Sequence, residues 1–212
     1  MDRETLGKPS RTQTVRQPIR PYPRLARLAT EILAPSPTTA VLLLLVAWHS
    51  APTAAEAARW GILAALFASF MPFLYIVRGV RRGRLTDHHV GDREQRRGPL
   101  LVGIASILVG LTLLTLWGAP RDLIAVVAAL AVGLMASLLV TLVWKLSIHT
   151  TVVTGAVTIL VLVFGPPLLV LAPLVALICW ARVAVRDHTP AQTVAGVALG
   201  ASVGAGVFAL LR

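Results

Sequence analysis

Residues 149–184 read HTTVVTGAVTILVLVFGPPLLVLAPLVALICWARVA, and this stretch decides the fold. It is apolar over more length than one membrane crossing needs, since a helix spans the hydrocarbon core with about 20 residues. Gly165-Pro166-Pro167 interrupts it, and proline ends a helix because it lacks a backbone N–H and clashes with the preceding turn. The stretch therefore predicts two antiparallel helices, 149–164 and 166–184.

The same apolar pattern recurs along the rest of the chain. Strand-like alternation is absent, and helices satisfy their own backbone hydrogen bonds in lipid. We therefore predict an all-α fold, a polytopic transmembrane helical bundle of six to seven spans. The first segment, 37–53, is short and has a re-entrant or interfacial helix as its alternative. The further predicted segments are 37–53, 58–80, 100–118, 122–144 and 191–211.

Composition supports this class. The chain has 212 residues, 56% of them hydrophobic, and a mean hydropathy of +0.78, well above the range of soluble proteins. Its net charge of +11 sits in short stretches between apolar segments, which is typical of juxtamembrane charge and not of nucleic-acid binding. We predict that residues 1–37 form a basic tail that is disordered or lies on the surface, with an arginine-rich transit peptide as the alternative. We predict that residues 38–212 form the transmembrane domain.

The basic residues also predict an orientation. Of the 20 lysines and arginines, all except Arg59, Arg121 and Arg212 fall on the side that holds the N-terminus. The positive-inside rule places that side in the cytoplasm, so we expect an integral plasma-membrane protein. The excess of arginine over lysine, with abundant alanine, valine and glycine, is typical of a bacterium with a GC-rich genome.

Three glycines follow one another at four-residue spacing in the last segment: Gly196, Gly200 and Gly204. They share one helix face, which allows close approach of another backbone. Internal packing is the first interpretation, and a homodimer through this face is the second.

Polar chemistry gathers on the basic side. Four of the five histidines lie in three stretches there: GRLTDHHVGDREQRRGP from Gly83, KLSIHTT from Lys145, and RVAVRDHTPAQTVAG from Arg182. Converging guanidinium groups favour a phosphate, and two histidines can serve as nucleophile and general acid. The alternative to a phosphate site is that the arginines are topology signals and the histidines are helix caps. A site at the membrane face would take a lipid whose head group carries phosphate.

These residues resemble the type 2 phosphatidic acid phosphatase superfamily over roughly residues 80–211. Arg182 and His188 have the spacing of its third signature, and Ser147 and His149 match its second, Pro-Ser-Gly-His. The first signature, Lys, six residues, Arg-Pro, is matched only by arginines. The resemblance implies hydrolysis of a lipid or polyprenyl phosphate or diphosphate through a phosphohistidine, without a cofactor. His188 is then the nucleophile and His149 the acid. The implied phosphate-binding residues are Arg84, Arg93, Arg96, Lys145, Ser147 and Arg182.

The chain departs from the signatures at several positions. Gln192 stands where the family has the aspartate that orients the nucleophile, and Asp187 is the nearest acidic substitute. Ala181 replaces the leading serine of the third signature, and Lys145-Leu146 replaces the proline of the second. A neutral amide can fix the histidine tautomer, but it cannot stabilise an imidazolium as a carboxylate does.

Two other functions stay open on the sequence. Asp87 and Asp92 in DHHVGD can hold Mg²⁺ against a diphosphate, which predicts a prenyl-transferring or prenyl-cyclising enzyme. With Gln192, the alternative is a catalytically lapsed protein that binds a phosphorylated lipid. Sensitivity to EDTA separates the magnesium enzyme from the histidine mechanism, and binding without turnover identifies the lapsed form.

Overall fold

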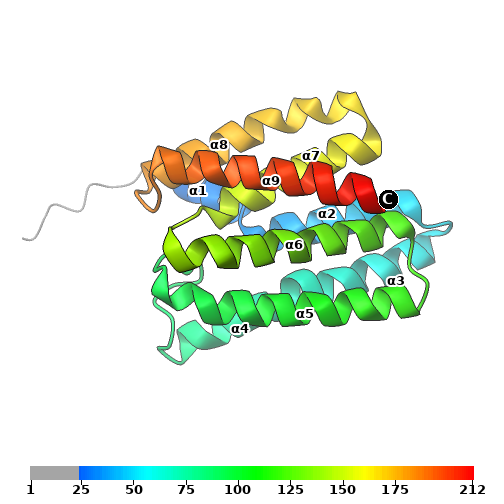
Figure 1. The fold of residues 1–212 in the computed structure, drawn as a ribbon, viewed down its shortest axis with the longest axis horizontal. Coiled ribbons are helices and arrows are strands. Elements are labelled where there is room, and N and C mark those ends of the chain that lie inside the picture. The colour runs from blue at the N-terminus through cyan, green and yellow to red at the C-terminus, as the bar shows by residue number, and fades with distance from the viewer. Residues whose placement is uncertain (1–23) are drawn as a thin grey trace, which may run out of the picture.

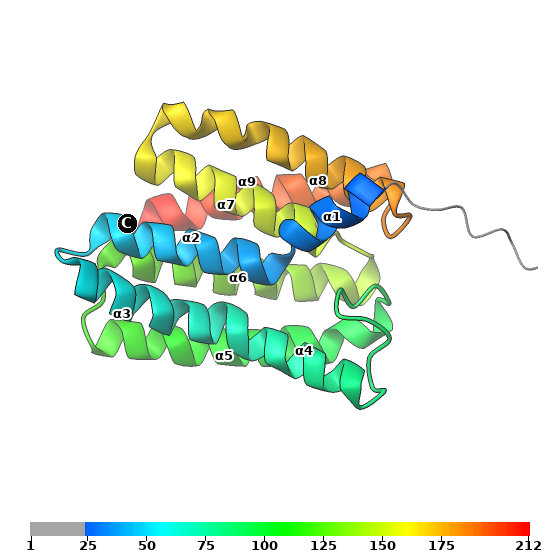
Figure 2. The ribbon, with the colours of Figure 1, turned by 180° about the vertical axis from the view of Figure 1, so that it is seen from behind.

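The structure is a computed structural model that describes residues 24–212, and every regular element in that range is a helix. The helices lie side by side along the long axis of a bundle (Figures 1 and 2). The all-helical prediction is confirmed. The α-helices are α1 Arg24–Ile32, α2 Pro35–Ser50, α3 Ala54–Ala65, α4 Met71–Arg81, α5 Arg97–Leu116, α6 Arg121–Val143, α7 Ile148–Phe164, α8 Ala172–Ala184 and α9 Pro190–Leu211. A π-helical turn, η1 Leu66–Phe70, joins α3 to α4, and two 3₁₀ turns, η2 Glu94–Arg96 and η3 Pro166–Leu171, precede α5 and α8.

The predicted break in the 149–184 stretch is confirmed. Helix α7 ends at Phe164, and Gly165 has a φ of 93°, a left-handed conformation that glycine adopts without a Cβ clash. The two prolines then start η3, where the first residues of a helical turn need no N–H partner. The chain reverses there, and α8 returns beside α7 (Figure 2).

All seven predicted segments are helical in the described residues, but they differ in length. Five helical stretches are long and apolar enough to cross a membrane, and the pair α1 and α2, bent by 45°, makes a sixth if it counts as one span. The predicted 149–164 segment corresponds to α7, which has only 17 residues.

Residues 24–37 of the predicted N-terminal tail are largely helical in the structure. They form α1 and the start of α2, whereas residues 1–23 lie outside the described part of the chain. Helix α1 is held by small side chains, since Ala26 and Ala29 pack on Ala181 of α8. An alanine face gives no apolar run, so the hydropathy pattern did not reveal it.

Helices α7 and α9 are in direct backbone contact through the glycine face of α9. A Cβ on Gly200 would collide with the carbonyl oxygen of Thr151, and one on Gly204 would lie 3.1 Å from the carbonyl oxygen of Gly155. Internal packing is therefore the correct interpretation of these glycines. The second interpretation, a homodimer through Gly196, Gly200 and Gly204, has no room there because α7 already occupies the face.

Three connections meet at one end of the bundle. The α4–α5 loop, the α6–α7 link and the α8–α9 corner lie at the end near α1, and the C-terminus lies at the other end (Figures 1 and 2). This arrangement brings together the three polar stretches of the sequence, although two long helices separate the first stretch from the second.

Candidate active site

The α4–α5 loop contributes Arg96. Its side chain is 3% exposed, and it donates from Nε to the carbonyl oxygen of Val90 at 2.8 Å and from Nη1 to that of Leu146 at 2.7 Å. Val90 has a φ of 49°, a conformation that costs a β-branched residue energy and that turns the loop back on itself. Arg96 thereby fastens the first polar stretch to the second.

Helix α7 begins at the second polar stretch. Ser147 is its N-cap, and its hydroxyl oxygen accepts from the Thr150 N–H at 3.5 Å. This cap places His149 in the first turn, where free backbone N–H groups and the helix dipole favour an anion. The His149 side chain is 4% exposed.

The α8–α9 corner holds the third stretch. Thr189 is the N-cap of α9, and Gln192 completes a capping box by accepting from the Thr189 N–H at 3.2 Å. The same oxygen, Gln192 Oε1, lies 3.1 Å from His188 Nδ1. Since this oxygen only accepts, Nδ1 carries the proton and His188 Nε2 has a free lone pair.

Arg182 reaches the same corner from the last turn of α8. Its Nη2 donates to Asp187 Oδ2 at 2.6 Å, and the side chain is only 1% exposed. Asp187 thus contacts Arg182, and Gln192, the other orienting residue predicted, is the one that contacts His188.

Backbone and side-chain bonds join the second and third stretches. The Ser147 N–H donates to the Gln192 carbonyl oxygen at 3.3 Å, and Thr150 Oγ1 donates to the Thr193 carbonyl oxygen at 3.2 Å. The residues brought together are Arg96, Lys145, Ser147, His149, Arg182, His188 and Gln192, and we call them the His–Arg cluster.

The His–Arg cluster has a strong positive field. Burial, followed by the charges of Arg96, Arg182 and Lys145, lowers the pKa of His188 to about 3 against the raising effect of the Gln192 hydrogen bond. Burial and the neighbouring Arg96 charge also lower the pKa of Lys145. His188 is therefore a neutral imidazole at physiological pH, the form that can act as a nucleophile.

Several nitrogen atoms of the cluster are buried and have no partner among the described residues. They are His149 Nε2, His188 Nε2, and Nε and Nη1 of Arg182. A buried guanidinium with unpaired N–H groups is costly, so a protein keeps one where a ligand completes its bonds. Their chemistry, cationic donors beside two imidazoles, suits a phosphate.

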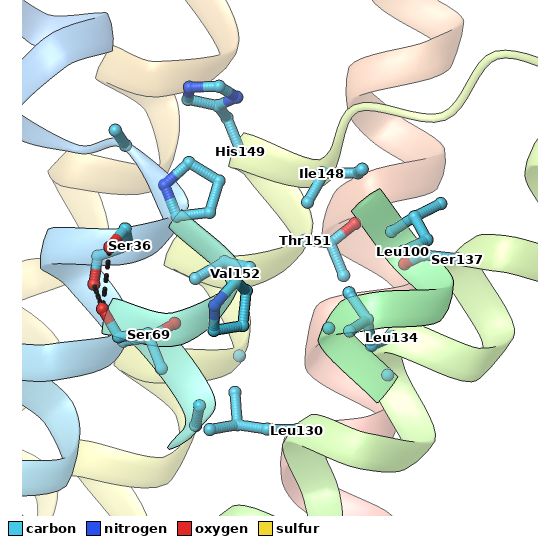
Figure 3. A pocket seen from close by; sticks show the side chains of 18 of the residues that line it. Ser36, Ser69, Leu100, Leu130, Leu134, Ser137, Ile148, His149, Thr151 and Val152 are labelled. Atoms are coloured by element: carbon cyan, nitrogen blue, oxygen red, sulfur yellow. Dashed lines mark hydrogen bonds between the residues drawn. The ribbon is translucent and has the colours of Figure 1, made fainter. Parts of the chain in front are cut away.

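A cavity of about 200 Å³ extends from this end into the bundle. His149 lies at one end of the cavity in Figure 3 and Leu130 lies towards the other, with Leu134 and Val152 between them. Its walls are mostly apolar side chains and glycines of α2, α4, α5, α6, α7 and α9, and Ser36 and Ser69, which also line it, pair with each other at 2.7 Å. An apolar cavity of this kind accepts a hydrocarbon guest.

Two predicted phosphate-binding residues lie apart from the cluster. Arg84 is exposed and Arg93 is half-buried, and neither side chain makes a hydrogen bond or ion pair with any residue in the described range. The loop backbone turns Arg96 inward instead, and Arg96 is the only one of the three that lines the cavity among the described residues.

Asp87 and Asp92, the predicted magnesium pair, serve the backbone of their own loop. Asp87 accepts hydrogen bonds from the N–H groups of His89 and Gly91. Burial raises the pKa of Asp87, but these hydrogen bonds outweigh that effect and lower the pKa. Asp92 accepts from the Glu94 N–H at 3.1 Å, ahead of η2. Both carboxylates thus stabilise the backbone of the loop.

Two neighbours of the site, Glu31 and His89, were not among the predicted site residues. The His89 ring centroid lies 5.1 Å from that of His149, and Glu31 of α1 accepts from His89 at 3.0 Å. One signal was present: Glu31 is the only acidic residue between Glu4 and Glu56.

Comparison of the chain with family models, curated proteins and solved structures found no match.

Proposed function

We propose that this protein is an integral-membrane phosphatase that hydrolyses a lipid or polyprenyl phosphate or diphosphate at the cytoplasmic face, in the manner of the type 2 phosphatidic acid phosphatases. One observation carries the proposal. His149 comes from the start of α7, and Arg182 and His188 come from the α8–α9 corner. These three side chains lie near one another, and each has a buried nitrogen atom with no hydrogen-bond partner among the described residues. Structural packing alone leaves those atoms unsatisfied, whereas a phosphate group satisfies them.

In the first step, His188 attacks phosphorus. Its Nε2 lone pair forms the N–P bond while the P–O bond to the lipid breaks, and His149, as the imidazolium, gives its Nε2 proton to the leaving oxygen and becomes neutral. Arg96 and Arg182 neutralise the charge of the phosphoryl oxygens, which is the main contribution that a protein makes to phosphoryl transfer. Gln192 keeps the proton of His188 on Nδ1.

In the second step, water attacks the phosphohistidine. His149 takes a proton from the water, the N–P bond breaks, and its electron pair returns to His188 Nε2. Free phosphate then leaves towards the polar end of the bundle. Neither step needs a metal ion or a redox partner, and the protons balance over the two steps.

The apolar cavity is suited to the lipid tail. It is lined by His149 and Arg96 at the polar end and runs between α2, α4, α5, α6, α7 and α9. A phosphate held by the His–Arg cluster leaves the attached hydrocarbon chain at the mouth of this cavity. A hydrocarbon tail that moves from the bilayer into this cavity stays in an apolar environment, so tail and head group are recognised together.

The helices provide the membrane setting. Five or six stretches in the described residues can cross a bilayer by length and composition. Arginines are concentrated at the end that holds the cluster, so the positive-inside rule supports a cytoplasmic site and N-terminus.

The test is phosphate release by protein purified in detergent, from a panel of lipid and prenyl phosphates and diphosphates in the presence of EDTA. We expect release by the wild type, and a loss of about 10³-fold or more in His188→Ala and in Arg182→Ala. Arg82→Ala is the matched control, because Arg82 is an exposed arginine next to the same loop.

Release that persists in His188→Ala would exclude the histidine mechanism. Tight binding of these lipids without release by the wild type would identify a lapsed phosphatase. Release that appears only when Mg²⁺ replaces EDTA would favour the magnesium enzyme.

A further inference from the structure

A second group of side chains lies next to the His–Arg cluster and takes no part in the mechanism above. Glu31 of α1 meets both histidines of the α4–α5 loop. Its Oε2 lies 3.2 Å from His88 Nε2, and its Oε1 lies 3.0 Å from His89 Nε2. One ligand atom from each residue falls within 4.8 Å of the others.

The loop holds both rings on the same side. Asp87 Oδ1 accepts from the His89 N–H at 2.7 Å, and Asp87 Oδ2 accepts from the Gly91 N–H, so the turn that carries the rings is fixed. The two rings are tilted against each other with centroids 4.0 Å apart. Two consecutive imidazoles are thus directed at one carboxylate before any ligand arrives.

Glu31 is held independently. Helix α1 packs through Ala26 and Ala29 on Ala181 of α8, so the carboxylate reaches the loop from a docked helix. The contact joins elements that are 57 residues apart in the chain.

Two of the three ligand separations match tetrahedral zinc, and the three ligand atoms all lie within 4.8 Å of one another. Zinc binds imidazole nitrogen and carboxylate oxygen at about 2.0–2.2 Å, which makes the edge between neighbouring ligands about 3.3 Å. The nitrogen–oxygen separations of 3.0 and 3.2 Å are close to that edge. Two imidazoles also favour zinc over magnesium or calcium, which prefer oxygen ligands.

An ion pair between Glu31 and a protonated His88 or His89 is the alternative explanation of the same contact. The two explanations differ in what they predict for zinc, because neutral imidazole is the form that coordinates metal.

We propose that Glu31, His88 and His89 bind one Zn²⁺-class transition-metal ion, with one coordination position left for water or another ligand. The ion ties α1 to the α4–α5 loop where His88, His89 and Arg96 line the mouth of the apolar cavity. This site is separate from the phosphatase proposal, because it requires no turnover.

The test is metal binding to the full chain, purified through a tag without histidines and stripped with chelator. Zn²⁺ is titrated by calorimetry, and bound zinc is counted by mass spectrometry after dialysis. Co²⁺ is added as a spectroscopic probe, since tetrahedral Co²⁺ has intense visible absorption. The variants are Glu31→Gln, His88→Ala and His89→Ala, and His49→Ala is the control because His49 lies outside this group.

We expect one zinc ion per chain, a tetrahedral Co²⁺ spectrum, and at least tenfold weaker binding in each of the three variants. The His49→Ala control should bind as the wild type does. Failure of the wild type to bind zinc at micromolar concentration would overturn the proposal. Binding that is equal in wild type and Glu31→Gln would also overturn it, since the metal would then occupy another place. Circular dichroism of each variant confirms that it is folded.

Discussion

Gln192 is the residue at which this site departs most from a carboxylate-assisted histidine. Its oxygen accepts from both Thr189 and His188, so it caps α9 and sets the tautomer of the nucleophile. Glutamate at this position keeps the length and both acceptor bonds, and it adds a charge that stabilises His188 when the ring becomes cationic. We therefore expect Gln192→Glu to raise kcat about tenfold, less than the ~10⁴-fold that a carboxylate-to-amide exchange costs in serine proteases.

Gln192→Leu is the complementary variant, because it keeps the size and removes the acceptor. Its kcat should fall at least tenfold while the KM changes little. Steady-state kinetics on the substrate found by the phosphate-release panel measures both effects. A Gln192→Glu enzyme slower than the wild type would contradict the role assigned to this residue.

His188 also predicts how stability depends on pH. The folded protein protonates this ring only near pH 3, whereas the unfolded chain does so near pH 6.5. Between these values the unfolded state holds more protons, so the free energy of unfolding decreases as the pH falls from 6.5 towards 3. We expect the Tm to fall on acidification, and to fall less steeply in His188→Gln.

Scanning fluorimetry from pH 7.5 to 4.5 measures these slopes. His49→Gln is the control, because it removes an exposed histidine and should keep the wild-type slope. Equal slopes in wild type and His188→Gln would show that His188 is not buried neutral.

At the level of elements, the α7–α9 contact holds the two halves of the site together. Gly200→Ala places a methyl group against the carbonyl oxygen of Thr151, where the backbone has no space to yield. We expect a loss of about 1–3 kcal/mol in stability, by the usual cost of overpacking, and a lower kcat because Ser147 and Gln192 are displaced. Gly206→Ala lies on the same helix and meets nothing within 4 Å, so its Tm should be unchanged or slightly raised.

The tail cavity gives a second prediction for the helices. Gly133 of α6 lines the cavity, and a Cβ there would meet only Val203 Cγ1 at 3.6 Å. Gly133→Leu should fill the space of two or three methylenes and raise the KM for a long-tailed substrate about tenfold. The KM for a short, water-soluble phosphate should stay the same. Val132→Leu, which is exposed on the same helix, is the control. Equal effects on long and short substrates would place the tail elsewhere.

Some helices and turns could be predicted from the sequence, and others could not. The break at Gly165-Pro166-Pro167 and the apolar helices were predictable, because proline chemistry and hydropathy are local properties. Helix α1 was not, since its buried face is alanine and threonine. Arg96 is the loop arginine that points inward, because of the turn at Val90 and η2. The spacing of residues in the sequence does not reveal that turn. The contact of Glu31 with His88 and His89 joins distant segments of the chain, so it is visible only in the structure.

At the level of the whole molecule, the distribution of charge predicts the orientation. In a Cys179→Ser background, which has no other cysteine, Arg82→Cys marks the end of the bundle with the site and Pro52→Cys marks the opposite end. A membrane-impermeant maleimide should label Pro52→Cys in intact cells, and Arg82→Cys only after permeabilisation. Labelling of Arg82→Cys in intact cells would place the site, and its substrate, at the outer surface.

The measurement that tests the central claim most directly is detection of the phosphohistidine itself. The protein is mixed with the substrate it hydrolyses, quenched in denaturing alkali, and analysed by peptide mass spectrometry. We predict one phosphoryl group on the peptide that contains His188, lost on brief acid treatment and absent from His188→Ala. Phosphate release by the wild type without any phosphoryl group on that peptide would contradict the mechanism.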